Sequence, residues 1–220
     1  FGGEYKGHKI GSCTYSDATI FSFHPVKSIA TGEGGMITTN STKLYEKLLL
    51  LRSHGVTKDP SKLSKNPGPW YYEMQDLGYN YRLSDIHAAL GVSQLKKLSQ
   101  FLNRRQEIVD MYNNTLKGIE WLRTPVQSDD CQSGNHLYVT QMDFEAIGKT
   151  RAEVMNELRS KGIGTQVHYI PLYHQPYYQQ FGLDKSDFPN TEAYYKKALS
   201  LPLYPKMTDE EVLHVINVVK

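Results

Sequence analysis

The chain has 220 residues, of which 39% are hydrophobic and 22% are charged, and its formal net charge is +2. This length is sufficient for one large domain, or for one domain and part of another. Because the charge is small and has no long run of one sign, we expect neither a nucleic-acid partner nor an anionic membrane surface.

The sequence also lacks the features of a membrane or secreted protein. No apolar run approaches the roughly 20 residues of a membrane-spanning helix, so we expect no membrane segment. The chain begins Phe-Gly-Gly-Glu-Tyr-Lys, without the basic start and apolar stretch of a secretory signal, and we expect it to be the middle of a longer cytoplasmic protein. Cys13 and Cys131 lie far apart, which indicates two reduced cysteines.

The first half of the chain alternates strands, loops and helices. Residues 18–23 and 35–40 are rich in β-branched and aromatic residues, and they predict two neighbouring buried strands. The leucine spacing of residues 41–54 predicts an amphipathic helix, and Gly55 ends it. Residues 56–70 contain three prolines and a glycine among polar residues, which predicts a long exposed loop.

Two helical segments follow, and then the pattern changes. Ser84 can cap a helix that continues to about residue 99, and a second helical segment continues to about residue 118. Strands are then expected at residues 120–123, 137–142 and 165–168, with helices that begin at the capping boxes Thr150–Glu153 and Thr208–Glu211, a helix end at Gly162, and a proline-rich connection over residues 171–205. We therefore expect one domain over residues 1–118 and a small α+β domain over residues 119–220.

The segment Ser22-Phe-His-Pro-Val-Lys27 carries the most chemical information. An expected strand ends at Ser22, a short loop presents Lys27, and closely spaced glycines then let the backbone turn tightly. Open α/β sheets bind ligands at the ends of their strands, where a neutral lysine amine can attack a carbonyl group. The alternative is that Lys27 is a solvated charge on a loop, which is the more usual position of a lysine.

Four ordered motifs resemble the DegT/DnrJ/EryC1/StrS family of sugar aminotransferases. They are Ser22–Lys27 with Thr31–Thr39, Arg52–Gly55, Leu77–Leu90 with Ser93–Leu98, and His168–Pro171. The resemblance covers nearly all of the chain. It implies the α/β fold of type I transferases that depend on pyridoxal phosphate (PLP), the aspartate aminotransferase-like fold, with part of the large domain followed by the small C-terminal domain.

Within this family, the His-Pro-Val-Lys sequence and the long connection from Arg52 to Tyr81 are most similar to the branch of pseudaminic acid synthesis. That similarity implies amino transfer from L-glutamate to C4 of a UDP-linked 4-keto-6-deoxy-N-acetylhexosamine, for flagellin glycosylation or polysaccharide biosynthesis. It also implies a homodimer with shared active sites. Two alternatives stay open: another family member that uses a dTDP- or GDP-keto sugar, and a noncatalytic oligomerising fragment.

The resemblance assigns roles to individual residues. Lys27 corresponds to the lysine that binds PLP covalently and moves protons during the reaction. Ser22 corresponds to a serine that binds the cofactor phosphate, and Asn80 to an asparagine that reaches the same phosphate from the partner subunit. The segment that lines the nucleotide-sugar pocket corresponds to His168, Tyr169, Ile170 and Pro171.

Other interpretations of these polar residues are ordinary structural ones. Ser22 can bond the backbone at a strand end, and Asn80 can serve as a turn residue. Arg82 suits either an anionic ligand or a surface ion pair, and His24 either touches the cofactor or packs in the loop. His168, His174 and His136 have no carboxylate or cysteine at ligand spacing, so we expect no metal site.

Part of the family's active site has no counterpart in the sequence. The phosphate-binding turn at a helix N-terminus, the aromatic residue stacked on the pyridine ring and the carboxylate that pairs with the pyridinium nitrogen are all unmatched. We therefore expect activity to require an N-terminal part that is outside these 220 residues.

Overall fold

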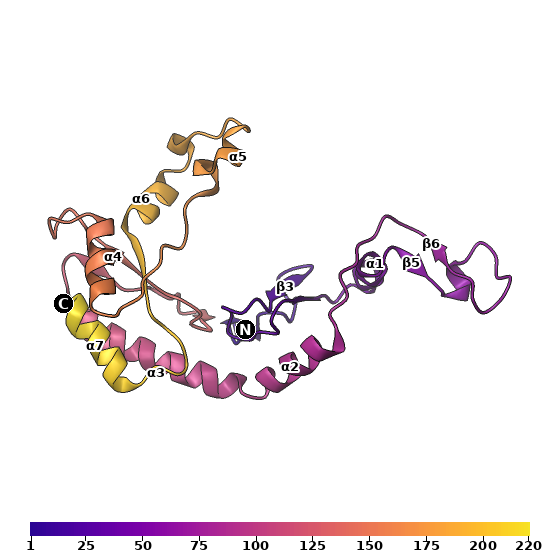
Figure 1. The fold of residues 1–220 in the computed structure, drawn as a ribbon, viewed down its shortest axis with the longest axis horizontal. Helices are drawn as coiled ribbons and strands as arrows, with labels where there is room; N and C mark the ends of the chain where they lie inside the picture. Colours follow the sequence, from indigo (N-terminus) through magenta and orange to yellow (C-terminus); the bar gives the residue numbers. More distant parts are fainter. The chain divides into compact units, whose positions relative to one another are not determined.

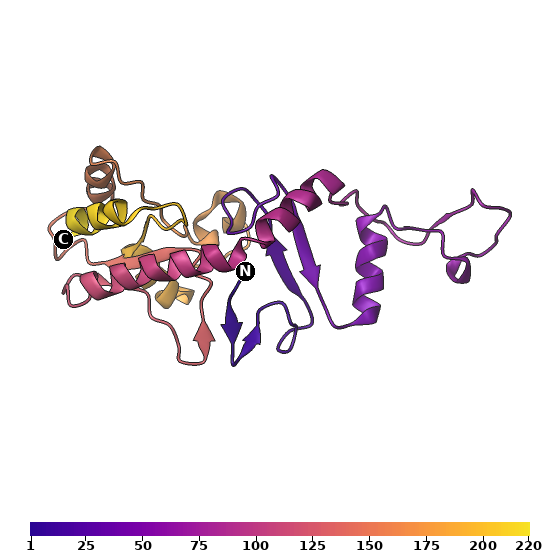
Figure 2. The ribbon, with the colours of Figure 1, turned by 90° about the horizontal axis from the view of Figure 1, so that it is seen from below.

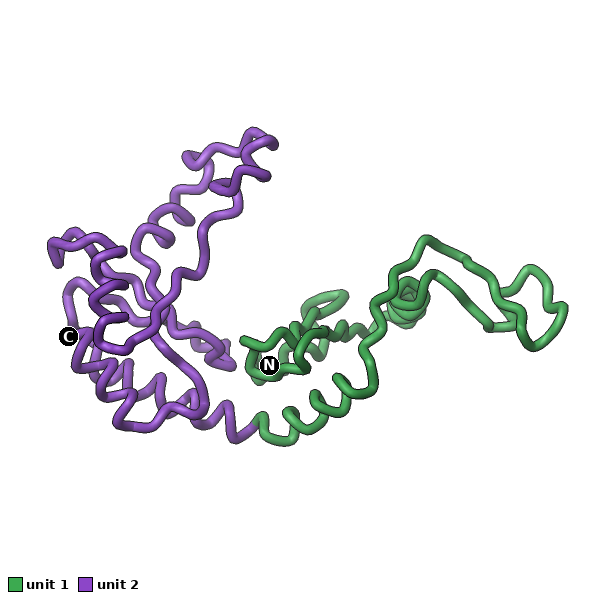
Figure 3. The backbone as a smooth tube through the Cα atoms, viewed as in Figure 1, with its two compact units in different colours: residues 1–98 green, residues 99–220 purple.

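The computed structural model describes all residues from 1 to 220, and they divide into two compact units, residues 1–98 and 99–220 (Figure 3). The division falls at residue 98 because the buried side chains of the following helix belong to the core of the second unit. The assignment of residues 1–118 and 119–220 to two domains stays a prediction. No helix combines the length and the apolar character that crossing a bilayer would require.

The first unit consists of three short antiparallel ladders and two helices (Figure 1). Strand β1 (Glu4–Tyr5) pairs with β2 (His8–Lys9), β3 (Thr19–Ser22) with β4 (Gly35–Thr38), and β5 (Val56–Thr57) with β6 (Glu73–Met74). The two helices are α1 (Thr42–Arg52) and α2 (Asp85–Leu95), and a 3-10 turn, η1 (Pro60–Lys62), lies between them in sequence. The adjacent strands predicted on either side of the lysine loop are confirmed, and so are both capped helices, because Ser41 and Ser84 accept hydrogen bonds from backbone amides in the first turns.

The prediction that β3 and β4 are buried is wrong for this chain. Ile20 of β3 is 77% exposed, and Met36 and Ile37 of β4 are exposed as well. A two-stranded ladder leaves both faces open unless other elements cover them. Helix α2 shows the same property, since Ile86 and Val92 point apolar side chains to solvent. The apolar residues of the first unit are therefore patterned for burial that the unit does not provide.

The second unit has a packed core between a sheet and three helices. The antiparallel sheet has the order β10-β9-β7, with β7 (Leu122–Arg123), β9 (Tyr138–Met142) and β10 (Ala198–Leu201). The remaining elements are α3 (Leu98–Leu116), β8 (Cys131–Gln132), α4 (Arg151–Ser160), η2 (Leu172–His174), α5 (Pro176–Gln179), η3 (Lys185–Asp187), α6 (Pro189–Lys197) and α7 (Asp209–Val219). Helix α7, yellow in Figure 2, lies beside α3, which is pink.

Two tyrosines lie at the centre of this core. The rings of Tyr112 on α3 and Tyr138 on β9 are 4.7 Å apart between centroids. Tyr138 donates a hydrogen bond to Asn113 Oδ1 at 2.8 Å, and Tyr112 donates one to the carbonyl oxygen of Pro202 at 2.8 Å. Burial raises the pKa of both phenols, so they stay neutral and each hydroxyl has a partner.

The capping boxes that predicted α4 and α7 are both present in the structure, and Gly162 follows α4 with a φ of +80°. Two other predictions for this unit are wrong. Residues 165–168 form no strand, because a single bridge joins Gln166 to Ser200 before the chain leaves the sheet. The expected connection over residues 171–205 instead contains helices and the strand β10, which completes the sheet against β9.

Candidate active site

The loop that carries Lys27 is closed by backbone hydrogen bonds at its base. The amide of Phe23 donates to Gly34 O at 2.9 Å, and the amide of Thr31 donates to Phe23 O at 3.0 Å. Within the loop, the amide of Lys27 donates to His24 O at 2.9 Å. Phe23 and Thr31 are buried, whereas the Lys27 side chain is half-buried. The backbone therefore fixes the base of the loop, and Lys27 as a residue stays partly exposed.

Two glycines after the lysine allow close packing at this base. Gly34 has a φ of +147°, and a Cβ there would lie 2.8 Å from Leu83 Cδ1 and 2.9 Å from Thr31 Oγ1. A Cβ on Gly35 would lie 2.9 Å from the carbonyl oxygen of Phe21. Real Cβ atoms do not occupy such positions without a shift of their neighbours. The glycine-rich sequence is thus required by the loop's own packing, which no other residue type would permit unchanged.

Ser22 and Lys27 belong to one strand and its following loop, as predicted, whereas Asn80 lies elsewhere in the first unit. Ser22 is exposed, and its Oγ accepts a hydrogen bond from the His24 amide at 3.3 Å, so the backbone-bonded alternative is realised. Asn80 is exposed and pairs through its backbone with Ser53. The structure does not bring Asn80 to the lysine loop, and its assignment to the cofactor phosphate stays a prediction.

His24 is oriented by its own loop. Its Nδ1 accepts a hydrogen bond from the Val26 amide at 3.4 Å, and its Nε2 lies 3.8 Å from Glu33 Oε1. The imidazole and the carboxylate are both largely exposed, so this pair is weak by itself. His24 thus has partners within its own loop, and its contact with the cofactor stays a prediction.

In the second unit, the four residues expected to line a nucleotide-sugar pocket do line one cavity. Its volume is about 750 Å³. The complete lining is Gln166, Val167, His168, Tyr169, Ile170, Pro171, Leu172 and Gln175. It contains no Asp, Glu, Lys or Arg, so His168 is the side chain in it that can carry a charge near neutral pH. The cavity thus combines one titratable ring with aromatic, amide and aliphatic groups.

Sequence reasoning missed the residue that holds His168. Ser200 on β10 is buried, and its Oγ lies 2.7 Å from His168 Nδ1. The available signal was a polar residue inside the apolar run Ala198–Leu201, next to a proline. That signal was hidden because the run falls in a segment whose prolines predicted a connection.

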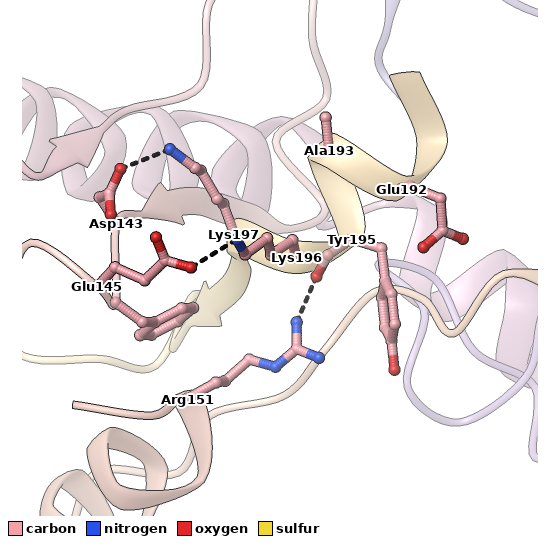
Figure 4. A pocket seen from close by; sticks show the side chains of 9 residues that line it. Asp143, Glu145, Arg151, Glu192, Ala193, Tyr195, Lys196 and Lys197 are labelled. Carbon is pink, nitrogen blue, oxygen red and sulfur yellow. Dashed lines mark hydrogen bonds and ion pairs between the residues drawn. The ribbon is translucent and has the colours of Figure 1, made fainter. Parts of the chain in front are cut away.

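A second cavity in this unit, of about 600 Å³, has charged walls (Figure 4). Lys197 pairs with Asp143 and Lys196 with Glu145, each at 2.6 Å from nitrogen to oxygen. Arg151 donates a hydrogen bond to the carbonyl oxygen of Tyr195 on α6. The hydrogen bond from Lys197 lowers the pKa of Asp143. The two lysine pairs join α6 to the segment before α4. Because these cations already have partners, the cavity is poorly suited to bind an anion.

The histidine considered as a metal ligand, His174, also has a partner. Its Nε2 lies 2.6 Å from Glu192 Oε1, which additionally accepts a hydrogen bond from Tyr173 at 2.8 Å. The bond from Tyr173, followed by that from His174, lowers the pKa of Glu192. The structure contains no group of three or more His, Cys, Asp and Glu side chains with the geometry of a metal site.

Lys27 lies on an anchored loop after a strand, in a chain of mixed α/β structure. This is the arrangement of a PLP-dependent transferase of the type I fold. Residues 1–220 match the model of the DegT/DnrJ/EryC1/StrS aminotransferase family, and the chain belongs to that family. The family depends on PLP and has the type I fold, so the expected fold class and cofactor are confirmed.

Two relatives of known name are similar to nearly the whole chain. The chain is 45% identical over 218 residues to the spore coat polysaccharide biosynthesis protein SpsC of Bacillus subtilis, covering 98% of this chain and 56% of that protein. It is 41% identical over 206 residues to the UDP-4-amino-4,6-dideoxy-N-acetyl-beta-L-altrosamine transaminase of Campylobacter jejuni, covering 94% and 52%.

Among solved structures, Helicobacter pylori PseC, an aminotransferase of pseudoaminic acid biosynthesis, matches with a TM-score of 0.86 and 34% identity over 99% of this chain and 56% of PseC. The chain therefore spans about half the length of the relatives that it matches.

Proposed function

We propose that the complete gene product transfers the amino group of L-glutamate to C4 of a UDP-linked 4-keto-6-deoxy-N-acetylhexosamine, as a cytoplasmic homodimer with PLP bound at Lys27. The observation that carries this proposal is the position of Lys27 on a loop closed by hydrogen bonds from Phe23 and Thr31. Membership of a PLP-dependent family supports it. The similarity to the Campylobacter jejuni transaminase supports the substrate.

The residues of the lysine loop fit the cofactor chemically. When bound, PLP supplies an electron sink for negative charge at Cα of the amino donor. Lys27 would hold the cofactor through its amine, and would then accept and return the proton at Cα. Ser22 uses one lone pair for the His24 amide, which leaves its hydroxyl hydrogen to donate to a phosphate oxygen. The backbone role and the phosphate role of Ser22 are thus compatible.

Asn80 would add a second phosphate donor from the partner subunit. Its backbone lies opposite Ser53 in a bridge whose hydrogen bonds join His54 to Tyr79 and Tyr81 to Arg52, and the side-chain amide of this exposed residue can donate two hydrogen bonds. The site would then be complete only in a dimer, with residues supplied by the N-terminal part of the protein. The uncovered apolar residues of the first unit, such as Ile20 and Ile86, are compatible with a homodimer that shares its sites.

The cavity of the second unit would receive the nucleotide sugar. Tyr169 presents an exposed aromatic face for a planar base, and Ile170 presents apolar surface beside it. His168 would face the diphosphate, because no other lining residue can carry positive charge. This assignment gives roles to three of the four residues of the matching motif, and the fourth, Pro171, lines the same cavity.

The test begins with the complete gene product. A covalent complex between Lys27 and PLP absorbs in the visible range, and borohydride should fix the label to Lys27, as mapped by peptide mass spectrometry. Lys27→Ala should abolish both the absorbance and the turnover. A protein that stays colourless with added PLP would support the noncatalytic alternative and end the proposal.

The substrate is tested separately. Purified protein is incubated with glutamate and each member of a panel of UDP-, dTDP- and GDP-4-keto sugars, and amino-sugar product is measured by mass spectrometry. We expect activity with the UDP-linked N-acetylhexosamine. Activity restricted to a dTDP or GDP sugar would contradict the substrate assignment and leave the aminotransferase assignment intact.

A further inference from the structure

Ser200, the buried serine of β10, exchanges two backbone hydrogen bonds with Gln166. The Ser200 amide donates to Gln166 O at 2.8 Å, and the Gln166 amide donates to Ser200 O at 3.3 Å. Ser200 is 4% exposed, and its neighbours Leu199 and Leu201 are buried apolar residues. A buried hydroxyl is unfavourable unless it has a hydrogen-bond partner. The presence of a serine here therefore requires a partner for its Oγ.

That partner is the imidazole of His168, whose Nδ1 lies 2.7 Å from Ser200 Oγ. His168 follows the bridge at Gln166 by two residues, at the point where the chain leaves the sheet edge. A hydroxyl can donate to an unprotonated Nδ1 or accept from a protonated one. One bond can thus hold the ring in the same orientation whether His168 is neutral or charged.

We propose that Ser200 is a positioning residue for nucleotide-sugar binding: its bond to Nδ1 of His168 holds the imidazole in the wall of the cavity that would receive the diphosphate. This inference rests on the proposed function, because that function places a UDP-sugar in the cavity. Since this lining has no lysine or arginine, the His168 ring is the lining group that can offer positive charge to an anion.

The structure also provides a matched control for the loss of a buried hydroxyl. Thr140 on the neighbouring strand β9 is fully buried, and its Oγ1 donates to Leu199 O at 2.8 Å. It makes this bond within the sheet and does not line the cavity of His168. Thr140→Val and Ser200→Ala therefore remove comparable buried hydroxyls, and only the second releases the imidazole.

The test measures binding of UDP to the complete gene product by isothermal titration calorimetry, with the melting temperature recorded for each variant. Ser200→Ala should weaken UDP binding about 3- to 10-fold, the size of one net hydrogen bond. Thr140→Val should leave the UDP dissociation constant within about twofold. His168→Ala and the double variant Ser200→Ala/His168→Ala should bind UDP equally, because the serine acts through the histidine.

Three results would overturn the inference: unchanged UDP binding in Ser200→Ala, additive losses in the double variant, or no UDP binding by the unaltered protein. The pyridoxal absorbance change on adding glutamate is a further readout, and Ser200→Ala should leave it unchanged. Loss of that response would show a general structural role instead. If the unaltered protein binds UDP but transaminates no UDP-sugar, the proposed function fails while the positioning role of Ser200 stands.

Discussion

Replacing Gly34 with alanine should loosen the loop that carries Lys27, because both the backbone conformation and the packing at this position exclude a side chain. An L-residue at a φ of +147° is strained by about 1–3 kcal/mol. The new Cβ would also lie 2.8 Å from Leu83 and 2.9 Å from the buried Thr31, and such overpacking costs about 1–3 kcal/mol. The sum is about 2–6 kcal/mol, acting at the point where the loop rejoins β4.

Gly32 is the matched control in the same loop. Its φ is +86°, but an added Cβ would meet nothing closer than His87 Nε2 at 3.8 Å. Gly32→Ala therefore introduces backbone strain of about 1–2 kcal/mol without the clash. The two variants should differ by about 1–3 kcal/mol, which is about 5- to 150-fold in an equilibrium constant.

The assay is titration of the complete gene product with PLP, followed by visible absorbance. Gly34→Ala should require a higher PLP concentration for half-saturation than Gly32→Ala, because only the anchored loop presents the amine correctly. Hydrogen exchange at the Thr31 amide should also be faster in Gly34→Ala than in Gly32→Ala. Equal PLP affinity in the two variants would refute the argument that packing at the loop base positions Lys27.

Two further predictions concern the first unit. Asn80→Ala should weaken PLP retention by about 1–3 kcal/mol through loss of a hydrogen bond to phosphate, and dialysis followed by absorbance should show it; full retention would contradict the assigned role. Hydrogen bonds from the Ser64 hydroxyl and amide, and then from Tyr71, lower the pKa of Glu73 from 4.5 to about 2. Because the folded-state pKa is lowered, the loop order that depends on ionised Glu73 should be complete above about pH 4.5 and should be lost as pH falls towards 2. The protection factor of the Ser64 amide, which corrects for the pH dependence of intrinsic hydrogen exchange, should follow this change, and Glu73→Gln should make that protection factor independent of pH in this range.

Local signals predicted the helices well. Ser41, Ser84, Thr150 and Thr208 each cap a helix through a bond to an amide a few residues away, so the evidence for each start lies within a few residues of sequence. Strands of the second unit were harder, because their partners are distant. Strand β10 is four residues long and pairs with β9, so its identity depends on contacts that no local pattern contains.

The residues of the candidate site also differ in whether their signal is local or depends on distant contacts. Lys27 and Ser22 could be recognised because strand, loop and glycines are adjacent in sequence. Ser200 could not, because its function follows from a bond to His168 across 32 residues. The burial predicted for β3 did not appear because burial depends on which elements cover a ladder, and the apolar pattern of Ile20 does not specify them.

The lysine loop is held at its base by backbone hydrogen bonds, whereas the side chains between these bonds can vary. Both bonds that close the loop use backbone atoms of Phe23, Thr31 and Gly34, so they do not depend on the side chains in between. Val26, which precedes the lysine, is largely exposed. Substitutions at such positions can therefore change the surroundings of the amine while the attachment of the loop to the sheet is retained. This arrangement would let related chains acquire different substrate preferences around an unchanged lysine.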